Sequence, residues 1–363
     1  SADAVAAQFP EVNLIRRDEN EGVWARSLAF AHCAGRYVVL LDDDSYPAPP
    51  EEWEKTGAKS QTVSRSIGYL DANPRCAAVV GRCVLPSGRA EACALPGVML
   101  SGAVCLRRRA LEEVGGFRKE FFRKAGEYDL SYRLWQAGWS VERFEDLEYR
   151  HDKFAAGRSA ALAHQLDLRN NLILVERFLP REMRTAYRRD TLRRYLAIAR
   201  HAGHLDAARQ AIVEARDWAR RERERGRPET LDDATLEKLF ARRYQKQAVA
   251  LWSLHRNVRR VVIADVSKNL YATWAAARDA DLEVVAIADD RPAFVGTTYR
   301  GVPVVGAADP RCAAVDGVIV SNINPAQIDG VCDGRAQHFD GPILRLWEPR
   351  VLGEHVTQNR RVA

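Results

Sequence analysis

The alternation of apolar and polar residues divides the chain into two α/β units with a long helical stretch between them. The run 37–41, rich in β-branched residues, predicts a buried strand of a parallel sheet, whereas apolar residues at helical spacing in 107–114 and 127–137 predict helices. Residues 155–225 keep the helical period, with a break at Gly203 that predicts an α-hairpin, and after a polar linker at 226–233 another predicted helix runs to about Trp252. The first unit is therefore predicted to be α/β and the stretch after it helical.

The same pattern predicts further elements in the first unit. The expected strands are 12–15, 77–81 and 98–106, and the expected helices are 23–34 and 51–73. Gly35 is expected to end the first of these helices in a left-handed conformation. Gly102, inside a predicted strand, indicates the close approach of a backbone or a ligand.

Strand and helix patterns alternate again after Arg260. The buried runs of this second unit are 261–264, 282–288, 317–321 and 343–346, and a helical run covers 270–278. They predict a small parallel, Rossmann-like domain. Its first turn reads Asp265-Val266-Ser267-Lys268-Asn269, without the glycines that let a backbone approach a pyrophosphate. We therefore favour a docking or regulatory role over dinucleotide binding. The predicted domains are 1–158, 159–257 and 258–350.

Three acidic residues, Asp42, Asp43 and Asp44, directly follow the strand 37–41, and prolines downstream forbid continued strand pairing. The acids thus lie at the carboxyl end of a core strand, where open α/β sheets bind ligands. Adjacent carboxylates repel one another, and a divalent cation relieves that repulsion. An acidic, solvated turn is the alternative interpretation.

A second group of candidates lies further along the chain. Glu127 and Asp129 stand in the first turn of a predicted helix, where acids can simply complement the helix dipole. His151 follows the last predicted strand of the first unit, and a lone histidine is often structural. All three nevertheless lie at the ends of core elements, as the acidic triplet does.

Charge and cysteine content narrow the class of protein. The net charge is +6, with much of the basic excess between Arg177 and Arg260. No nucleic-acid recognition motif accompanies it, so we expect attraction to phosphorylated substrates or an anionic membrane surface, and no nucleic-acid partner. The seven cysteines form no Cys-x-x-Cys pair, and no apolar run approaches the ~20 residues that span a bilayer. We expect a cytoplasmic protein, with peripheral association at the inner face of the membrane as an addition.

Taken in order, these residues resemble the family 2 glycosyltransferases, which have the GT-A fold. The matching motifs are Asn20-Glu21-Gly22, Ala25-Arg26, Gly35-Arg36-Tyr37, Asp42-Asp43-Asp44, Gly115-Gly116-Phe117, Glu127-Tyr128-Asp129-Leu130, Arg133-Leu134, Gly138-Trp139 and His151. The resemblance implies a mixed, mostly parallel sheet flanked by helices. Ser1-Ala2-Asp3 matches the segment after the second strand of such domains, so the first two strands are expected to be missing from this chain.

The resemblance also implies roles for the matched residues. Those expected around the nucleotide sugar are Asn20, Arg26, Asp42 and Asp43. Asp44 and His151 are expected to bind a divalent metal, Mn²⁺ or Mg²⁺, which neutralises the leaving diphosphate. Glu127 or Asp129 would accept the proton of the acceptor hydroxyl. Between these two we favour Glu127, because Gly126 allows a sharp turn before it.

The expected function is metal-assisted, inverting transfer of a sugar from a nucleotide-diphosphate sugar to a saccharide or glycolipid, in cell-surface polysaccharide biosynthesis of a bacterial type. The alternative is a non-catalytic module that binds sugar nucleotides or recruits partners. Convergence of Asp44, His151 and Glu127 on one cleft would distinguish the two.

Overall fold

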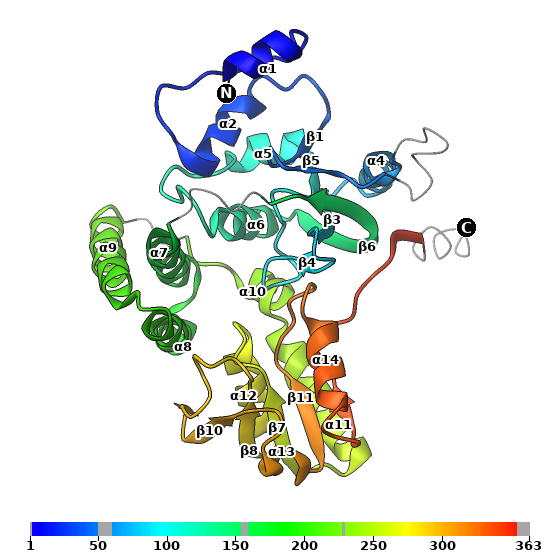
Figure 1. The fold of residues 1–363 in the computed structure, drawn as a ribbon, viewed down its shortest axis with the longest axis vertical. Coiled ribbons are helices and arrows are strands. Elements are labelled where there is room, and N and C mark those ends of the chain that lie inside the picture. Colours follow the sequence, from blue (N-terminus) through cyan, green and yellow to red (C-terminus); the bar gives the residue numbers. More distant parts are fainter. Residues whose placement is uncertain (1, 50–59, 154–158, 227–228, 354–363) are drawn as a thin grey trace.

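The computed structural model describes residues 2–49, 60–153, 159–226 and 229–353 (Figure 1). One sheet with its helices forms the upper half of the molecule in Figure 1, and a second sheet with its helices forms the lower half. Helices α7 (Ala160–Phe178), α8 (Arg181–His201) and α9 (Leu205–Glu224) stack beside them. No described helix has both the length and the apolar character needed to cross a lipid bilayer.

The first sheet is built around β3, which is almost entirely buried because β5 and β6 pair with it on its two sides. The strand order is β1-β5-β3-β6-β2, and β4 also pairs with β3. The strands are β1 (Tyr37–Leu40), β2 (Ser45–Pro47), β3 (Cys76–Val84), β4 (Ala90–Glu91), β5 (Val104–Arg107) and β6 (Ser140–His151).

The predicted mixed α/β fold is confirmed, but the strands of this sheet are not mostly parallel. Among the described pairs only β3–β6 is parallel, and β1 pairs with β5 in the antiparallel sense at the end of the sheet. An apolar, β-branched run indicates a strand but carries no signal for the direction of its neighbour. The direction follows from long-range pairing instead.

Several local predictions for the first unit are confirmed and others are wrong. Its helices are α1 (Ala2–Gln8), α2 (Ala25–Phe30), α4 (Thr62–Ala72), α5 (Arg108–Val114) and α6 (Gly126–Gln136), with a 3₁₀ turn, η1 (Gly22–Trp24), before α2. Gly115 ends α5 with φ +82°. Gly35 has no positive φ, because the chain has already left the helix at Phe30. Part of the predicted helix 51–73 lies outside the described residues.

One predicted strand, 12–15, is absent from the described residues, and another, 98–106, forms only in its second part. Residues 12–15 are mostly exposed and have no neighbouring strand to complete their hydrogen bonds, so the apolar run remains a loop. Residues 98–103 form a turn, and the strand begins only at Val104. A short apolar run therefore forms a strand only where the sheet offers it a partner.

The helical segment follows its predicted pattern. Gly203 separates α8 from α9 with φ +73°, which forms the expected antiparallel hairpin. The helix expected to end near Trp252 is divided into α10 (Asp233–Phe240) and α11 (Arg242–Arg256) by Ala241, whose φ is +48°.

The second sheet has the order β12-β11-β7-β8-β10-β9. Apart from the β9–β10 hairpin its pairs are parallel, so the predicted Rossmann-like unit is confirmed. Its elements are β7 (Arg260–Ala264), α12 (Leu270–Asp279), β8 (Glu283–Ala288), β9 (Thr298–Tyr299), β10 (Val302–Val305), α13 (Pro310–Ala313), β11 (Gly317–Val320), α14 (Ile328–Ala336) and β12 (Ile343–Leu344).

The two halves share packing. The largest apolar cluster runs from Phe121 on the first unit, through the helices α7 to α11, to Val261 and Ile263 of β7. After the second sheet the chain returns to the first: Leu352 is buried against Leu70 and neighbouring apolar residues. The three-domain division stays a prediction, and these contacts join the parts that it separates.

Candidate active site

The antiparallel pairing of β2 with β6 brings Asp44 and His151 together. Strand β2 pairs with β6 so that Ser45 lies opposite His151, which leaves Asp44 beside the imidazole. The distance from His151 Nε2 to Asp44 Oδ1 is 3.0 Å, and to Asp42 Oδ2 it is 3.9 Å. One ligand atom from each of the three residues lies within 4.8 Å of the others. This oxygen and nitrogen donor set could hold a divalent cation.

The other ring nitrogen of His151 meets a residue that the sequence did not single out. His151 Nδ1 lies 3.0 Å from Glu91 Oε2 on β4, and Lys153 also pairs with that carboxylate. Burial by itself would raise the pKa of Glu91, but Lys153 and His151 outweigh it and hold the pKa below its ordinary value. An anionic Glu91 favours the tautomer with the proton on Nδ1, which would leave Nε2 able to bind a cation beside the two aspartates.

Asp42 is held in place by three contacts. Arg26 from α2 forms an ion pair with the Asp42 carboxylate. The backbone N–H of Asp42 donates to Ser45 Oγ at 2.7 Å. A Cβ atom on Gly102 would lie 2.9 Å from Asp42 Oδ2, so the group that closely approaches this glycine is a side-chain carboxylate and not the predicted backbone or ligand. Arg26 Nη1 is buried and has no hydrogen-bond partner among the described residues. It remains available to a ligand beside the acids.

The two candidate bases have opposite surroundings. Glu127 is partly exposed and accepts a hydrogen bond from Ser101 Oγ at 2.8 Å. The Asp129 carboxylate is fully buried, 2.7 Å from Arg133 and 3.3 Å from each of Arg118 and Arg177. Asp129 therefore serves an internal ion cluster, whereas Glu127 can reach a ligand.

The turn before Glu127 is not made by Gly126. Lys124 and Ala125 adopt the left-handed conformation, with φ of +71° and +60°, and Gly126 is already helical. A Cβ atom on Gly126 would approach Val23 Cγ2 to 3.1 Å. A glycine there allows close packing of α6 against Val23 of η1.

Two adjacent residues, Ser101 and Gly102, lie between Glu127 and the acids. Ser101 donates a hydrogen bond to Glu127, and Gly102 lies against the Asp42 carboxylate. Neighbouring Cα atoms are about 3.8 Å apart, so Glu127 and the group of Asp42, Asp44 and His151 face the same region of the first sheet.

The remaining predicted site residues lie at the surface. Asn20 is exposed, and its Oδ1 accepts from the N–H of Gly22 at 3.0 Å, which shapes the turn before η1. Asp43 is exposed at the turn that links β1 to β2. The sequence contained no signal for Glu91 or Ser101, since both reach the site through long-range pairing.

Comparison with known proteins agrees with the motifs of the N-terminal part. Residues 1–59, which hold Asn20, Arg26 and the acidic triplet, match the model of glycosyl transferase family 2. No curated protein matches the chain. Among solved structures, the crystal structure of S. aureus TarS is similar, with 13% sequence identity and a TM-score of 0.36. That match covers 54% of this chain and 35% of the TarS chain.

Proposed function

We propose that this chain, which matches the model of glycosyl transferase family 2 over residues 1–59, transfers a sugar from a nucleotide-diphosphate sugar to a hydroxyl of a saccharide or glycolipid. The observation that carries the proposal is the grouping of Asp42, Asp44 and His151 beside Arg26. Assembly of a cell-surface polysaccharide is the proposed setting.

The metal would be held by Asp44 and His151, with Asp42 next to them. A divalent ion there would neutralise the charge that develops on the leaving diphosphate. A mixed oxygen and imidazole set suits Mn²⁺ better than Mg²⁺. The unpartnered Nη1 of Arg26 supports a second contact to the same diphosphate.

Glu127 is the proposed base. Its carboxylate would accept the proton of the attacking hydroxyl, and the hydrogen bond from Ser101 orients it. Attack from the face opposite the diphosphate would invert the anomeric carbon. The buried ion cluster around Asp129 supports Glu127 over Asp129 in this role.

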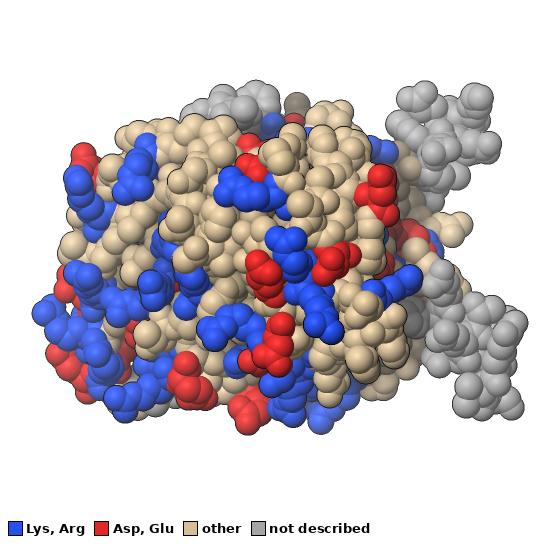
Figure 2. Space-filling view, turned by 90° about the horizontal axis from the view of Figure 1, so that it is seen from below, with Lys and Arg blue, Asp and Glu red and all other residues tan. Residues whose placement is uncertain are grey.

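An acceptor linked to lipid would be met at a membrane surface. Figure 2 shows Lys and Arg side chains gathered toward the side of the molecule on which α8 and α9 lie in Figure 1. This gathering supports peripheral association of a cytoplasmic enzyme with anionic lipid, which sedimentation with phosphatidylglycerol vesicles would test against neutral vesicles.

Donor binding tests the proposed function most directly. We expect one member of a panel of UDP-, GDP- and dTDP-hexoses to raise the melting temperature in the presence of Mn²⁺. A ligand at a concentration of a hundredfold its Kd adds about 2.7 kcal/mol to the free energy of unfolding. Asp44→Asn should abolish the effect, and Ser64→Ala on α4 is the matched surface control. Binding without release of nucleoside diphosphate to any acceptor would favour the non-catalytic alternative, and no Mn²⁺-dependent shift would contradict both.

A further inference from the structure

A cavity of about 370 Å³ lies between α8 and the carboxyl side of the second sheet. Its helical wall carries Arg193, Arg194 and Arg200, and the opposite wall is largely apolar, with Val266, Leu270, Phe294 and Val304 among its residues. Ligand pockets for small molecules are typically about 300–1,000 Å³ and combine an apolar lining with a few polar groups. The cavity has the size and composition of such a pocket.

The charge of this cavity is unbalanced. Within the part of the chain that the structure describes, none of its three arginines has a carboxylate oxygen within 4.0 Å, whereas Arg188 on the same helix lies 3.8 Å from Glu176. The acid that lines the cavity, Asp190, is already bound to the Tyr299 hydroxyl and to Arg300. The guanidinium groups therefore remain available to an anion.

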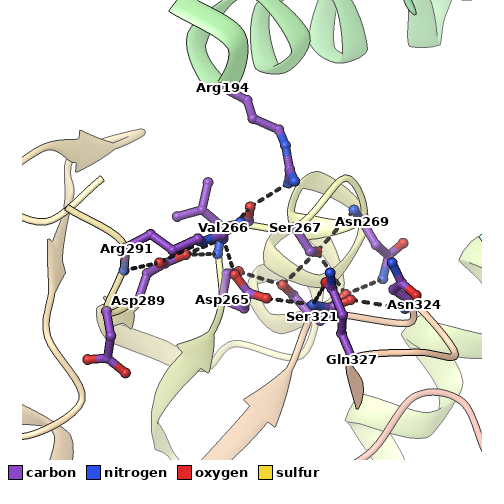
Figure 3. A network of polar contacts seen from close by, with 12 residues as sticks. Arg194, Asp265, Val266, Ser267, Asn269, Asp289, Arg291, Ser321, Asn324 and Gln327 are labelled. Carbon is purple, nitrogen blue, oxygen red and sulfur yellow. Dashed lines mark hydrogen bonds and ion pairs between the residues drawn. The ribbon is translucent and has the colours of Figure 1, made fainter. Parts of the chain in front are cut away.

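Residues of the Rossmann-like unit orient two of these arginines. Arg194 Nη1 donates to the Val266 carbonyl at 2.5 Å, and Figure 3 shows it reaching from the helix above to that turn. The Arg193 guanidinium lies over the Tyr299 ring, 5.3 Å from its centroid. Burial of Arg193 lowers its pKa, which is the effect of removing a cation from water without full compensation. Positioned, partly desolvated arginines bind phosphate oxygens strongly.

The position where a dinucleotide pyrophosphate would sit in such a sheet is closed. Asp265, directly after β7, has φ +76°, and its carboxylate is bound by Arg291 and by Asn322 Nδ2 at 2.6 Å. Figure 3 shows this network filling the space between the first turn and Ser321. Because these side chains already bind one another at this turn, the groups left available to an anion are the arginines on the α8 side.

We propose that the cavity between α8 and the second sheet binds a small organic phosphate, with the phosphate on Arg193 and Arg200 and the organic part against Phe294 and its apolar neighbours. The volume exceeds what inorganic phosphate needs, and the apolar wall provides the contact for an organic group. The site uses residues of the helical segment and of the Rossmann-like unit, and none of those around Asp44 and His151.

Isothermal titration of the full chain with AMP, glucose 6-phosphate and inorganic phosphate tests the proposal. The buffer contains EDTA, so that a metal-dependent donor site does not contribute. We expect AMP or the sugar phosphate to bind more tightly than inorganic phosphate. Arg193→Gln combined with Arg200→Gln should weaken that binding by about tenfold or more, as expected for lost charge-assisted hydrogen bonds.

Arg189→Gln is the matched control, since Arg189 is an exposed arginine of the same helix that does not line the cavity. It should bind as the wild type does, and so should Asp44→Asn, which separates this site from the proposed donor site. Thermal unfolding checks that each variant is folded. The proposal is overturned if no organic phosphate binds, if inorganic phosphate binds equally well, or if the double variant keeps wild-type affinity.

Discussion

At the scale of single residues, burial distinguishes groups that are chemically alike. Glu127 and Asp129 are both carboxylates in the first turn of α6. Asp129 is fully enclosed by arginines, and Glu127 has a single hydroxyl donor from Ser101 and access to solvent. A fully buried carboxylate that is paired with guanidinium groups is out of reach of a substrate hydroxyl. The difference explains why one of two neighbouring acids is suited to proton transfer.

Glu127→Gln keeps the shape of the side chain and removes the proton acceptor. We expect turnover to fall by roughly 10²–10⁴-fold, the usual size of a general-base contribution, with donor affinity nearly unchanged. Steady-state kinetics together with donor titration measure both. Asp129→Asn should instead lower the melting temperature, because among the described residues Asp129 is the one ion-pair partner of the largely buried Arg133. Full turnover in Glu127→Gln, with loss of turnover in a stable Asp129→Asn, would transfer the role to Asp129.

Glu91 is predicted to control metal affinity without binding the metal. Glu91→Ala removes the partner of His151 Nδ1, so the ring loses its fixed tautomer and orientation. We expect Mn²⁺ affinity, followed by titration calorimetry, to fall by roughly 10–100-fold. Glu91→Gln keeps an oxygen that can accept the Nδ1–H bond, so it should keep part of the Mn²⁺ affinity that Glu91→Ala loses. Glu148→Ala on the same strand as His151 is the control, and unchanged affinity in Glu91→Ala would rule out this positioning role.

The sequence could predict Asp42 to Asp44 as candidates because they follow an apolar strand, and His151 because it ends the sheet region of the first unit. It could not predict Glu91, which lies in a two-residue strand, or the ion cluster around Asp129. Both depend on residues far apart in the chain: Glu91 is 60 positions from His151, and Arg177 is 48 from Asp129. Such pairs leave no local pattern of hydrophobic and polar positions.

At the scale of secondary structure, helices with strong periodicity and glycine ends were predictable, as α5 with Gly115 and the hairpin at Gly203 demonstrate. Short apolar runs were not, because 12–15 and 98–103 resemble strands but lack a partner. The turn 98–103 instead places Ser101 next to Glu127 and Gly102 next to Asp42.

Gly102→Ala should move Asp42 without unfolding the protein. The new methyl group would lie 2.9 Å from Asp42 Oδ2, and the carboxylate is the part that can shift. Misplacement by about 1 Å can cost roughly 10²-fold in rate, so we expect a large loss of kcat/KM. Gly68→Ala on α4, with no atom within 4 Å of its Cβ position, is the matched control and should keep wild-type activity. Equal activity in both variants would contradict the importance of this close approach.

At the scale of the whole molecule, the parallel, Rossmann-like character of the second sheet followed from alternating strand and helix patterns, whereas its strand order and the contacts between the two halves did not. Arg350 and Leu352 carry no signal that assigns them to the first sheet. In the structure the backbone N–H of Glu145 donates to the Arg350 carbonyl at 2.9 Å, and Leu352 N–H donates to Asp146 Oδ1 at 2.7 Å. Residues 350–352, which follow the Rossmann-like unit, thus pack on the first unit.

The packing of residues 350–352 on the first unit predicts which elements a substitution at Leu352 destabilises. Leu352 is buried with Leu70 and Phe144 between α4 and β6, so Leu352→Ala removes apolar contacts from the first sheet, although 352 follows the last strand of the second. A buried Leu→Ala change typically costs roughly 2–5 kcal/mol. Hydrogen exchange followed by mass spectrometry should therefore show faster exchange in α4 and β6, with β7 and β11 nearly unchanged. Leu254→Ala is the matched control, because Leu254 on α11 is 75% exposed and should alter neither region. Faster exchange confined to β7 and β11 would mean that the chain end stabilises the second sheet and not the first.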